Sequence, residues 1–137
     1  YRSNIRVIEL CDKTIDIDKT NVEAYYLKGC ALVNLKNYDD ATEEFINSLA
    51  IDGDYWQARL GIADINRLTG EYEDAIDVYD SVLKINNGSY EALKGKALTY
   101  FEMEEYKKAN NYFDKANSLC DLDVKSKEIW DMCLEKM

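Results

Sequence analysis

The hydrophobic and polar positions of this chain follow a pattern that returns every 34 residues. Tyr38, Tyr72 and Tyr106 are separated by this step (72 − 38 = 34 and 106 − 72 = 34). The other columns that keep the register are Ala24, Ala58 and Ala92; Gly29, Ala63 and Ala97; Ala41, Ala75 and Ala109; Phe45, Tyr79 and Phe113; and Ile51, Ile85 and Leu119. Internal repetition at this period indicates a stacked array of helical units.

Each copy of the pattern predicts two helices joined by a short turn. In the first copy, Tyr38, Ala41 and Phe45 have the spacing of one helical face, which predicts a second helix over residues 37–51. The first helix is expected over residues 22–35. Small residues on both helices should allow their axes to approach closely, with the large residues filling the space toward the next unit.

The ends of the predicted helices carry turn and capping residues. Lys36, Gly70 and Glu104 share the column of the turn between the two helices. A tight turn often needs a positive φ there, which suits Gly70 and strains the other two residues unless they use another turn. The residues expected as N-caps of the first helices are Thr20, Asp54 and Gly88.

The flanks continue the same register. Residues 1–18 fall where the second helix of a preceding unit belongs, and residues 124–137 fall where a further first helix belongs. Trp130 and Leu134 are expected to pack back onto the last full repeat, and the polar residues around them suit a capping helix. The alternative is that the array continues in the full protein. The predicted division of a single domain is 1–21, 22–55, 56–89, 90–123 and 124–137. Because the first residue is Tyr1 and not Met, we expect a fragment of a longer protein.

Over residues 22–121 the sequence resembles the tetratricopeptide repeat (TPR) family. The run Gly70-Glu71-Tyr72, followed by Ala75 and Tyr79, matches the family pattern well. The departures are Arg59 and Leu93 at an early aromatic column, and Gly53, Asn87 and Asp121 at the terminal proline column. The resemblance implies an all-α fold, a right-handed superhelical solenoid of antiparallel helix pairs.

The resemblance also implies where a partner binds. In this family the first helices line a concave groove in which an extended or helical peptide lies. The corresponding groove residues of this chain are Glu23, Tyr26, Cys30, Val33, Asn34, Gln57, Leu60, Asp64, Arg67, Leu68, Glu91, Lys94, Leu98, Phe101 and Glu102.

These groove columns differ between the copies, whereas the structural columns are alike. Tyr26, Leu60 and Lys94, for example, share one column. Solvent-exposed positions can drift in this way, but several of these residues are too apolar for ordinary exposed surface, which favours an apolar binding patch. Some family members hold a C-terminal carboxylate with Lys and Asn on this face. Only Lys94 fits that arrangement, so we expect no carboxylate clamp.

Charge and composition narrow the class of partner. The chain has 17 basic and 27 acidic residues, a net charge of −10 and a mean hydropathy of −0.47. Such a charge argues against nucleic acid and favours basic partners, so an apolar peptide or helix with basic flanks is expected. No apolar stretch is long enough for a membrane span and no signal peptide is visible, so a cytoplasmic location is the default expectation.

Nothing in the sequence predicts catalysis. The chain has no histidine and no phosphate-binding glycine loop, so no catalytic residue, cofactor or metal is expected. Cys11, Cys30, Cys120 and Cys133 lack ligand spacing and are interpreted as small buried apolar groups. The favoured function is a non-catalytic protein-binding scaffold. Self-association as a homo-oligomer, through the groove or the array ends, is the alternative, and an enzyme or metal-binding module is the least expected.

Overall fold

The computed structural model describes residues 2–137, which form eight α-helices and no strand. The helices are α1 (Arg2–Ile17), α2 (Val22–Asn34), α3 (Tyr38–Ile51), α4 (Trp56–Leu68), α5 (Tyr72–Ile85), α6 (Tyr90–Glu102), α7 (Tyr106–Leu119) and α8 (Val124–Lys136). The all-α class predicted from the periodicity is therefore confirmed. No helix within this range combines the length and apolar character that crossing a bilayer requires.

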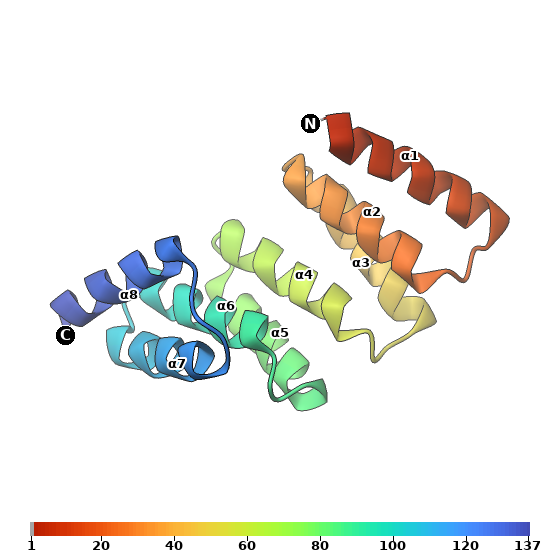
Figure 1. Ribbon diagram of the computed structural model, residues 1–137. Coiled ribbons are helices and arrows are strands. Elements are labelled where there is room, and N and C mark those ends of the chain that lie inside the picture. The colour runs from red at the N-terminus through yellow and green to blue at the C-terminus, as the bar shows by residue number, and fades with distance from the viewer. Residues whose placement is uncertain (1) are drawn as a thin grey trace. The chain divides into compact units, whose positions relative to one another are not determined.

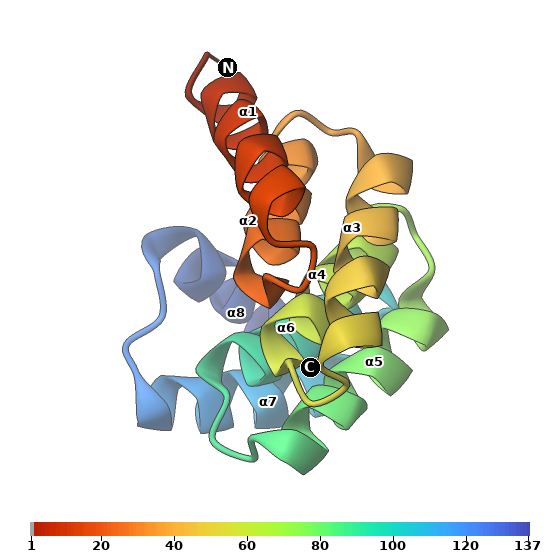
Figure 2. The same cartoon turned by 90° about the vertical axis from the view of Figure 1, so that its right-hand side faces the viewer.

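Contacts divide the chain into two compact units, which are described one at a time. The first ends at Ile65 and the second begins at Asn66, so the boundary falls inside α4. In the first unit, α2 packs against α1 on one side and α3 on the other, each neighbour running antiparallel to it (Figures 1 and 2). The buried residues at the centre of this unit are Leu32, Ala41, Phe45, Ala58 and Ile65.

The ring of Phe45 is the centre of the first unit. It is 1% exposed and lies directly against the backbone of two glycines on the neighbouring helices. A Cβ atom added to Gly29 would come within 2.6 Å of this ring, and one added to Gly61 within 2.5 Å. The absence of side chains at these two positions therefore allows α2 and α4 to approach the ring of α3.

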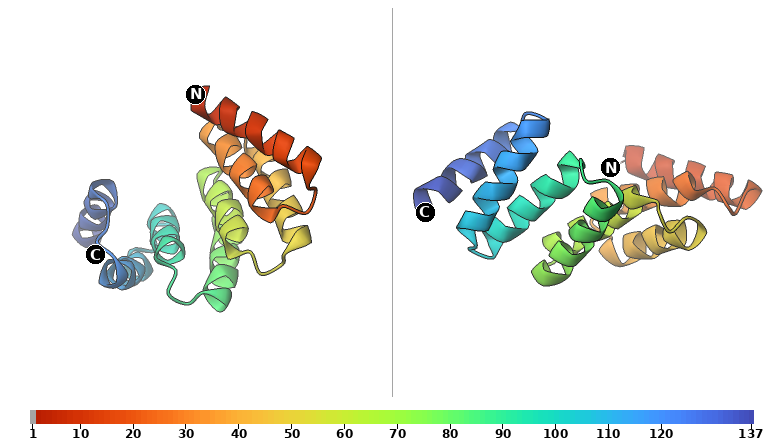
Figure 3. Two further views of the ribbon diagram at one scale, coloured as in Figure 1. Left: turned by 45° about the vertical axis from the view of Figure 1, so that its right-hand side comes forward. Right: turned by 90° about the horizontal axis from the view of Figure 1, so that it is seen from below.

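In the second unit, α6 lies between α5 and α7 and also contacts α8 (Figure 3). The core residues of this unit are Leu93, Ala97, Ala109, Phe113, Ala116, Leu122 and Cys133. A fully buried ring again meets a glycine, because a Cβ atom at Gly95 would come within 2.3 Å of Tyr79. In each unit, a buried aromatic ring thus packs against a helix segment that has no side chain.

The turns between paired helices use the left-handed region of φ in all three copies. Gly70 has φ 86°, while Lys36 and Glu104 have φ 62° and 60°. The expected strain at the two non-glycine residues is confirmed; a left-handed non-glycine residue costs about 1–2 kcal/mol. In return, the N–H of the following residue reaches back to close the helix, as Asn37 does to the Leu32 carbonyl at 2.9 Å.

The N-caps lie elsewhere than predicted. Thr20 and Gly88 were the expected caps, but the side chains of Asn21 and Ser89 accept the hydrogen bonds, from the N–H groups of Ala24 and Ala92. The Thr20 hydroxyl instead donates to the nearby Asp18 carboxylate at 2.7 Å. Asp54 precedes α4 by more than one residue, and its N–H bonds to the Asp52 carboxylate. Asn and Ser are as effective as Thr at an N-cap, so a one-residue shift has little cost.

Helix α8 packs on the last full repeat through a different pair of residues than expected. Trp130 does so as predicted: it stacks on Phe113 with ring centroids 6.0 Å apart, and its indole N–H donates to Asn110 Oδ1. The prediction for Leu134 is wrong, because this side chain is 48% exposed. Cys133 is buried instead, since Trp130 and Cys133 are three residues apart and share one face of the helix.

Two lysines of the first helices make ion pairs at equivalent positions. Lys28 lies 2.8 Å from Asp12 and 3.7 Å from Glu44. Lys96, two periods later, lies 2.5 Å from Asp80, and its side chain is only 5% exposed. In the intervening repeat the same two columns hold Ile46 in place of the acid and Ile62 in place of the lysine.

The Lys96 ammonium has further support from α7. It donates to the Tyr112 hydroxyl at 2.9 Å and lies 4.1 Å from the centre of the same ring. Burial lowers the pKa of Lys96, but the hydrogen bonds to Asp80 and Tyr112 outweigh burial and hold the pKa above its ordinary value. Lys96 therefore stays charged in a nearly dry site between α5, α6 and α7.

We expect Asp80→Asn to destabilise the protein by about 1–3 kcal/mol, because a buried ammonium would lose its carboxylate. The matched variant Asp12→Asn should cost less than about 1 kcal/mol, since Lys28 is more exposed and keeps Glu44. Urea unfolding of both variants measures the difference. Equal losses of stability in the two variants would show that the burial of Lys96 does not raise the cost of removing its carboxylate partner.

Gly95→Ala should lower the free energy of unfolding by about 1–3 kcal/mol, because the new methyl group collides with the buried Tyr79 ring. The control is Gly53→Ala, where the nearest atom to an added Cβ is 4.0 Å away. That variant should be neutral or stabilise the protein by up to about 1 kcal/mol. If Gly95→Ala unfolded at the same urea concentration as Gly53→Ala, the close contact would be refuted.

Candidate functional site

Seven of the predicted groove residues surround one pocket in the first unit. Helix α2 and helix α4 supply them: Tyr26, Cys30, Val33, Asn34, Gln57, Leu60 and Asp64. The pocket has a volume of about 160 Å³. The spacing of these residues places them on one face of each helix, so the first helices of two successive repeats form the two walls.

Two further residues complete the pocket and were not among the predicted site residues. Phe45 and Gly61 also line it. Gly61 lacks the side chain that would otherwise separate the pocket from the buried ring. The sequence did contain a signal: Gly61 and Gly95 are one period apart (95 − 61 = 34), and each meets the aromatic ring of the preceding second helix.

Tyr26 forms part of the pocket wall and part of the core. Its ring lies 5.9 Å from that of Phe45 and 5.5 Å from that of Tyr55. Burial and a hydrogen bond with the Cys30 side chain raise the pKa of the Tyr26 hydroxyl far above its ordinary value. Part of the Tyr26 ring, which was assigned to the groove, therefore packs against the core. Its hydroxyl is uncharged at neutral pH.

Besides Tyr26 and Cys30, the polar residues that line the pocket are two amides and one acid. Asn34 donates to Asn4 of α1 at 3.2 Å, which fixes its side chain at the edge of the first wall. Asp64 is the only charged residue among those that line the pocket. Burial raises the pKa of the Cys30 thiol, and the negative charge of Asp64 adds to this effect. The site can thus hold an apolar group with a cationic group at its edge.

The remaining predicted residues of the first two copies lie outside this pocket. Glu23 is exposed and lines a different pocket between α1 and α2. Arg67 belongs to the second unit, where its side chain donates to the Tyr79 hydroxyl at 3.2 Å. Leu68, at the end of α4, is 51% exposed.

The five predicted residues of the third copy are engaged within the second unit or exposed to solvent. Lys94 lies 3.5 Å from the Asp123 carboxylate and 5.5 Å from the centre of the Tyr90 ring. Leu98 and Phe101 are half-buried and pack on the core of this unit, and Glu91 and Glu102 are exposed. Lys94 thus faces a carboxylate of its own chain.

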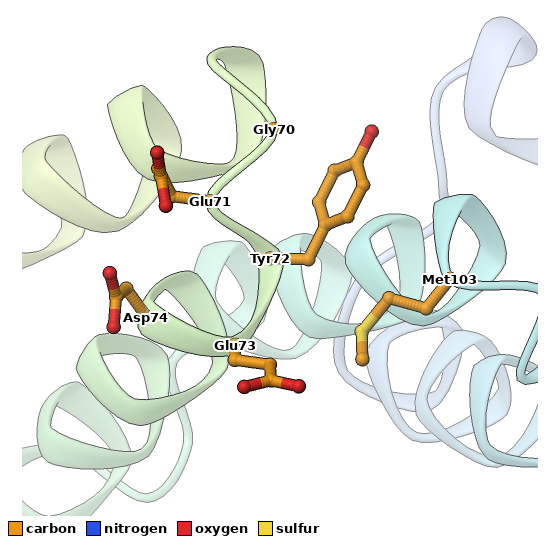
Figure 4. Close-up of a pocket in the computed structure, with 6 residues that line it drawn as sticks. All are labelled: Gly70, Glu71, Tyr72, Glu73, Asp74 and Met103. Atoms are coloured by element: carbon orange, nitrogen blue, oxygen red, sulfur yellow. The ribbon is translucent and has the colours of Figure 1, made fainter.

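The second unit contains a wider pocket with an acidic rim at the start of α5. It has a volume of about 340 Å³ and is lined by Gly70, Glu71, Tyr72, Glu73, Asp74 and Met103. Figure 4 shows that the three carboxylates do not converge on a common point. Among the residues that the structure describes, no group of three or more Cys, Asp or Glu side chains could hold a metal ion.

The four cysteines are free thiols in different surroundings. Cys11 and Cys133 are buried, as predicted, and Cys30 is half-buried in the pocket wall. The prediction is wrong for Cys120, which is exposed. Cys120 follows the last residue of α7, and a position directly after a helix end has few neighbours that could cover it.

The raised pKa of Tyr26 predicts a specific loss of stability in alkali. An unfolded tyrosine ionises near pH 10, whereas the folded state holds the Tyr26 proton to higher pH. This contribution to stability is complete below about pH 10 and is lost as the pH rises above it. The free energy of unfolding, measured in urea from pH 8 to 11, should fall less steeply for Tyr26→Phe than for the parent. Identical slopes would contradict the prediction.

Comparison with known proteins identifies the repeat. Residues 26–90 match the model of a tetratricopeptide repeat family. A TPR repeat-containing protein of Methanocaldococcus jannaschii is 30% identical over 112 residues, which covers 81% of this chain and 19% of the relative. The human DnaJ homolog subfamily C member 7 is 28% identical over 109 residues, which covers 69% of this chain and 22% of the relative. The chain spans about a fifth of the length of these curated relatives.

Solved structures agree on the fold. A crystal structure of MamA superposes with a TM-score of 0.78 at 22% identity, covering 93% of this chain and 75% of that one. The TPR domain of Arabidopsis OM64 superposes with a TM-score of 0.79 at 16% identity, covering 85% of this chain and 96% of that domain. These structures share the fold, while the family model, the TPR relative and the 34-residue columns identify the chain as a member of the tetratricopeptide repeat family.

Proposed function

We propose that this chain is a non-catalytic scaffold that binds a segment of a partner protein. The observation that carries the proposal is the pocket between α2 and α4, which is walled by Tyr26, Val33 and Leu60 and has Asp64 at its edge. A pocket of this kind offers apolar area for one anchoring side chain and a negative charge for a neighbouring basic one. A relative of this chain from Arabidopsis thaliana, 24% identical over 100 residues, is named as a subunit of the anaphase-promoting complex, which is consistent with a role in assemblies.

The partner segment is an apolar peptide or helix with basic flanks. The chain carries a net charge of −10, and Asp64 is the acid among the residues that line the pocket. These charges attract a basic segment and repel an acidic one, so they affect the rate of association and the choice of partner more than the final affinity. The apolar contacts at Leu60 and Val33 supply most of the affinity.

A peptide-display selection on the parent and two variants tests this proposal. Leu60→Glu introduces a carboxylate into the pocket, whereas Ile46→Glu introduces one at a 54% exposed position of α3 that does not line it. Apolar peptides with basic flanks should be enriched on the parent and on Ile46→Glu. Their dissociation constants should rise at least about tenfold on Leu60→Glu and should increase with salt.

Circular dichroism checks that both variants stay folded. Enrichment of the same peptides on all three proteins would rule out the pocket as the binding site. If no peptide were enriched and the parent sedimented as an oligomer that Leu60→Glu dissociates, the pocket would serve self-association instead.

A further inference from the structure

Helix α7 carries the opposite net charge to α3 and α5, its equivalents in the two preceding copies. Helix α3 has four acidic residues and no basic one, and α5 has four acidic residues and one lysine. Helix α7 has three lysines and one acid. In one exposed column the change is direct, since Asp40 and Asp74 are followed by Lys108 (108 − 74 = 34). The buried aromatic column keeps its character at Phe113, so the charge reversal concerns the surface of α7.

Four residues of α7 form a stripe that faces α5. Their steps of four, three and four residues place them on one side of the helix. The residues of this α7 stripe are Lys108, Tyr112, Lys115 and Leu119. The Tyr112 hydroxyl accepts a hydrogen bond from Lys96, whose ammonium also pairs with Asp80 of α5. The stripe therefore lies beside the space between α5 and α7.

A pocket of about 570 Å³ occupies this space, with α6 contributing to its lining. Tyr112, Lys115 and Leu119 of the stripe line it together with Leu83 of α5 and Leu93 of α6. Leu119 is 54% exposed although it is apolar. The pocket lies between the second helices of two successive repeats, and a stacked array grows at its ends. A repeat added before or after these two would therefore not fill it.

Two tyrosines restrain the exposed lysines of the stripe. The rings of Tyr100 and Tyr112 stack with their centroids 5.6 Å apart. The Lys108 ammonium lies 5.5 Å from the centre of the Tyr100 ring, and the Lys115 ammonium lies 4.8 Å from that of Tyr112. Within residues 2–137, neither of these lysines forms an ion pair with a carboxylate. Two positive charges are thus held in place for an anionic partner at a reduced cost in side-chain entropy.

We infer that the α7 stripe and its pocket bind an acidic segment of a partner protein. Lys108 and Lys115 are seven residues apart, which is about 10 Å along a helix. An extended segment spans about 10 Å between carboxylates that are three residues apart. An apolar residue two positions further reaches Leu119, which lies one helical turn beyond Lys115. The expected motif is acid–x–x–acid–x–apolar in an extended segment, and the same three groups have spacings of seven and four residues in a helical one.

This surface differs from the groove proposed above in its helices and in the charge that it attracts. The groove pocket belongs to the first unit and has Asp64 at its edge, which favours basic flanks. The α7 stripe belongs to the second unit and favours acids. The inference therefore goes beyond the proposed function and does not depend on it.

The stripe fits an acidic peptide better than a nucleic acid. Asp80 and Asp114 also line the pocket, and they repel a continuous phosphate backbone. Each of the two tyrosine rings stacks on the other and has an ammonium over it, which leaves little ring surface for a base. A peptide, in contrast, can place uncharged residues opposite the two acids.

A second copy of this chain is a poorer occupant than a short segment. The acids of α3 are complementary to the stripe, but each copy carries a net charge of −10. Charges at a protein surface act over about 8–10 Å at physiological salt. A short acidic segment is exposed mainly to the stripe, whereas a whole second chain is also repelled by the acidic surface around it. Charge complementarity thus favours a segment of a different protein.

Peptide libraries test the inference. Peptides of about 18 residues carry Glu at the two acid positions and Leu at the apolar position, in the extended spacing or in the helical one, with all other positions varied. A control library has Gln in place of each Glu. Binding of selected peptides, labelled with a fluorophore, is measured by fluorescence anisotropy.

The stripe variant combines Lys108→Asp with Lys115→Ser. These are the residues of the preceding copy at the same columns, Asp74 and Ser81, so the variant should keep its fold. A matched control combines Lys125→Asp with Lys127→Ser, which changes the net charge equally at two exposed positions of α8. Circular dichroism checks the fold of both, and Lys115→Ser alone serves as a milder second variant of the stripe.

The Glu library should be enriched over the Gln library, and the dissociation constants should rise with salt. The stripe variant should weaken binding at least about tenfold, whereas the α8 control and Leu60→Glu should change it less than about twofold. Equal or absent enrichment of the Glu library would overturn the inference. Equal weakening by the stripe variant and the α8 control would also overturn it, because net charge and not the stripe would then explain binding.

Two further measurements decide between the occupants. If a thymidine oligonucleotide bound the parent as tightly as the selected peptides and lost this affinity on the stripe variant, the assignment to a protein segment would be wrong. If the parent sedimented as a dimer that the stripe variant dissociates, the occupant would be a second copy. Because Leu60→Glu affects only the groove, failure here is distinguishable from failure of the proposed function.

Discussion

The contact on which the structure depends is that between a buried aromatic ring and a helix segment without a side chain. Phe45 meets Gly29 and Gly61, and Tyr79 meets Gly95. A ring can be buried between helices only if the helices leave room for it, and glycine leaves the most. The same contact determines the pocket between α2 and α4, since Gly61 is at once a neighbour of the ring and a part of the pocket lining. Packing and the candidate binding site therefore share their central residues.

The periodicity of the sequence predicted the fold class because it reports residues that every copy must bury. Columns such as Ala41 and Phe45 repeat since the helix pair cannot form without them. Even the strain at Lys36 and Glu104 could be predicted, because the column of Gly70 shows which backbone geometry the turn requires. The N-caps were harder to predict from the sequence. Thr20 and Asn21 are adjacent and chemically similar, and only the fold decides which side chain caps the helix.

The candidate site could be predicted in part. The resemblance to the repeat family, combined with helical spacing, was enough to bring seven residues of two copies to one pocket, because each first helix presents the same face. It could not show that Tyr26 is half used by the core or that Lys94 faces Asp123, since these contacts join residues of different helices with no fixed spacing. It also missed Gly61, because a search for binding groups considers side chains and glycine has none.

The two paired lysines have a consequence for how many repeats this array can lose at a time. The pairs Lys28–Asp12 and Lys96–Asp80 recur at twice the period of the fold, and isoleucines occupy the columns between them. Loss of residues 56–89 would leave every helix in register. Lys96 would then face Ile46 in place of its partner Asp80. An ammonium would then be buried without its carboxylate. Loss of this one repeat would thus cost more stability than loss of two successive repeats, which would bring Lys96 to Asp12.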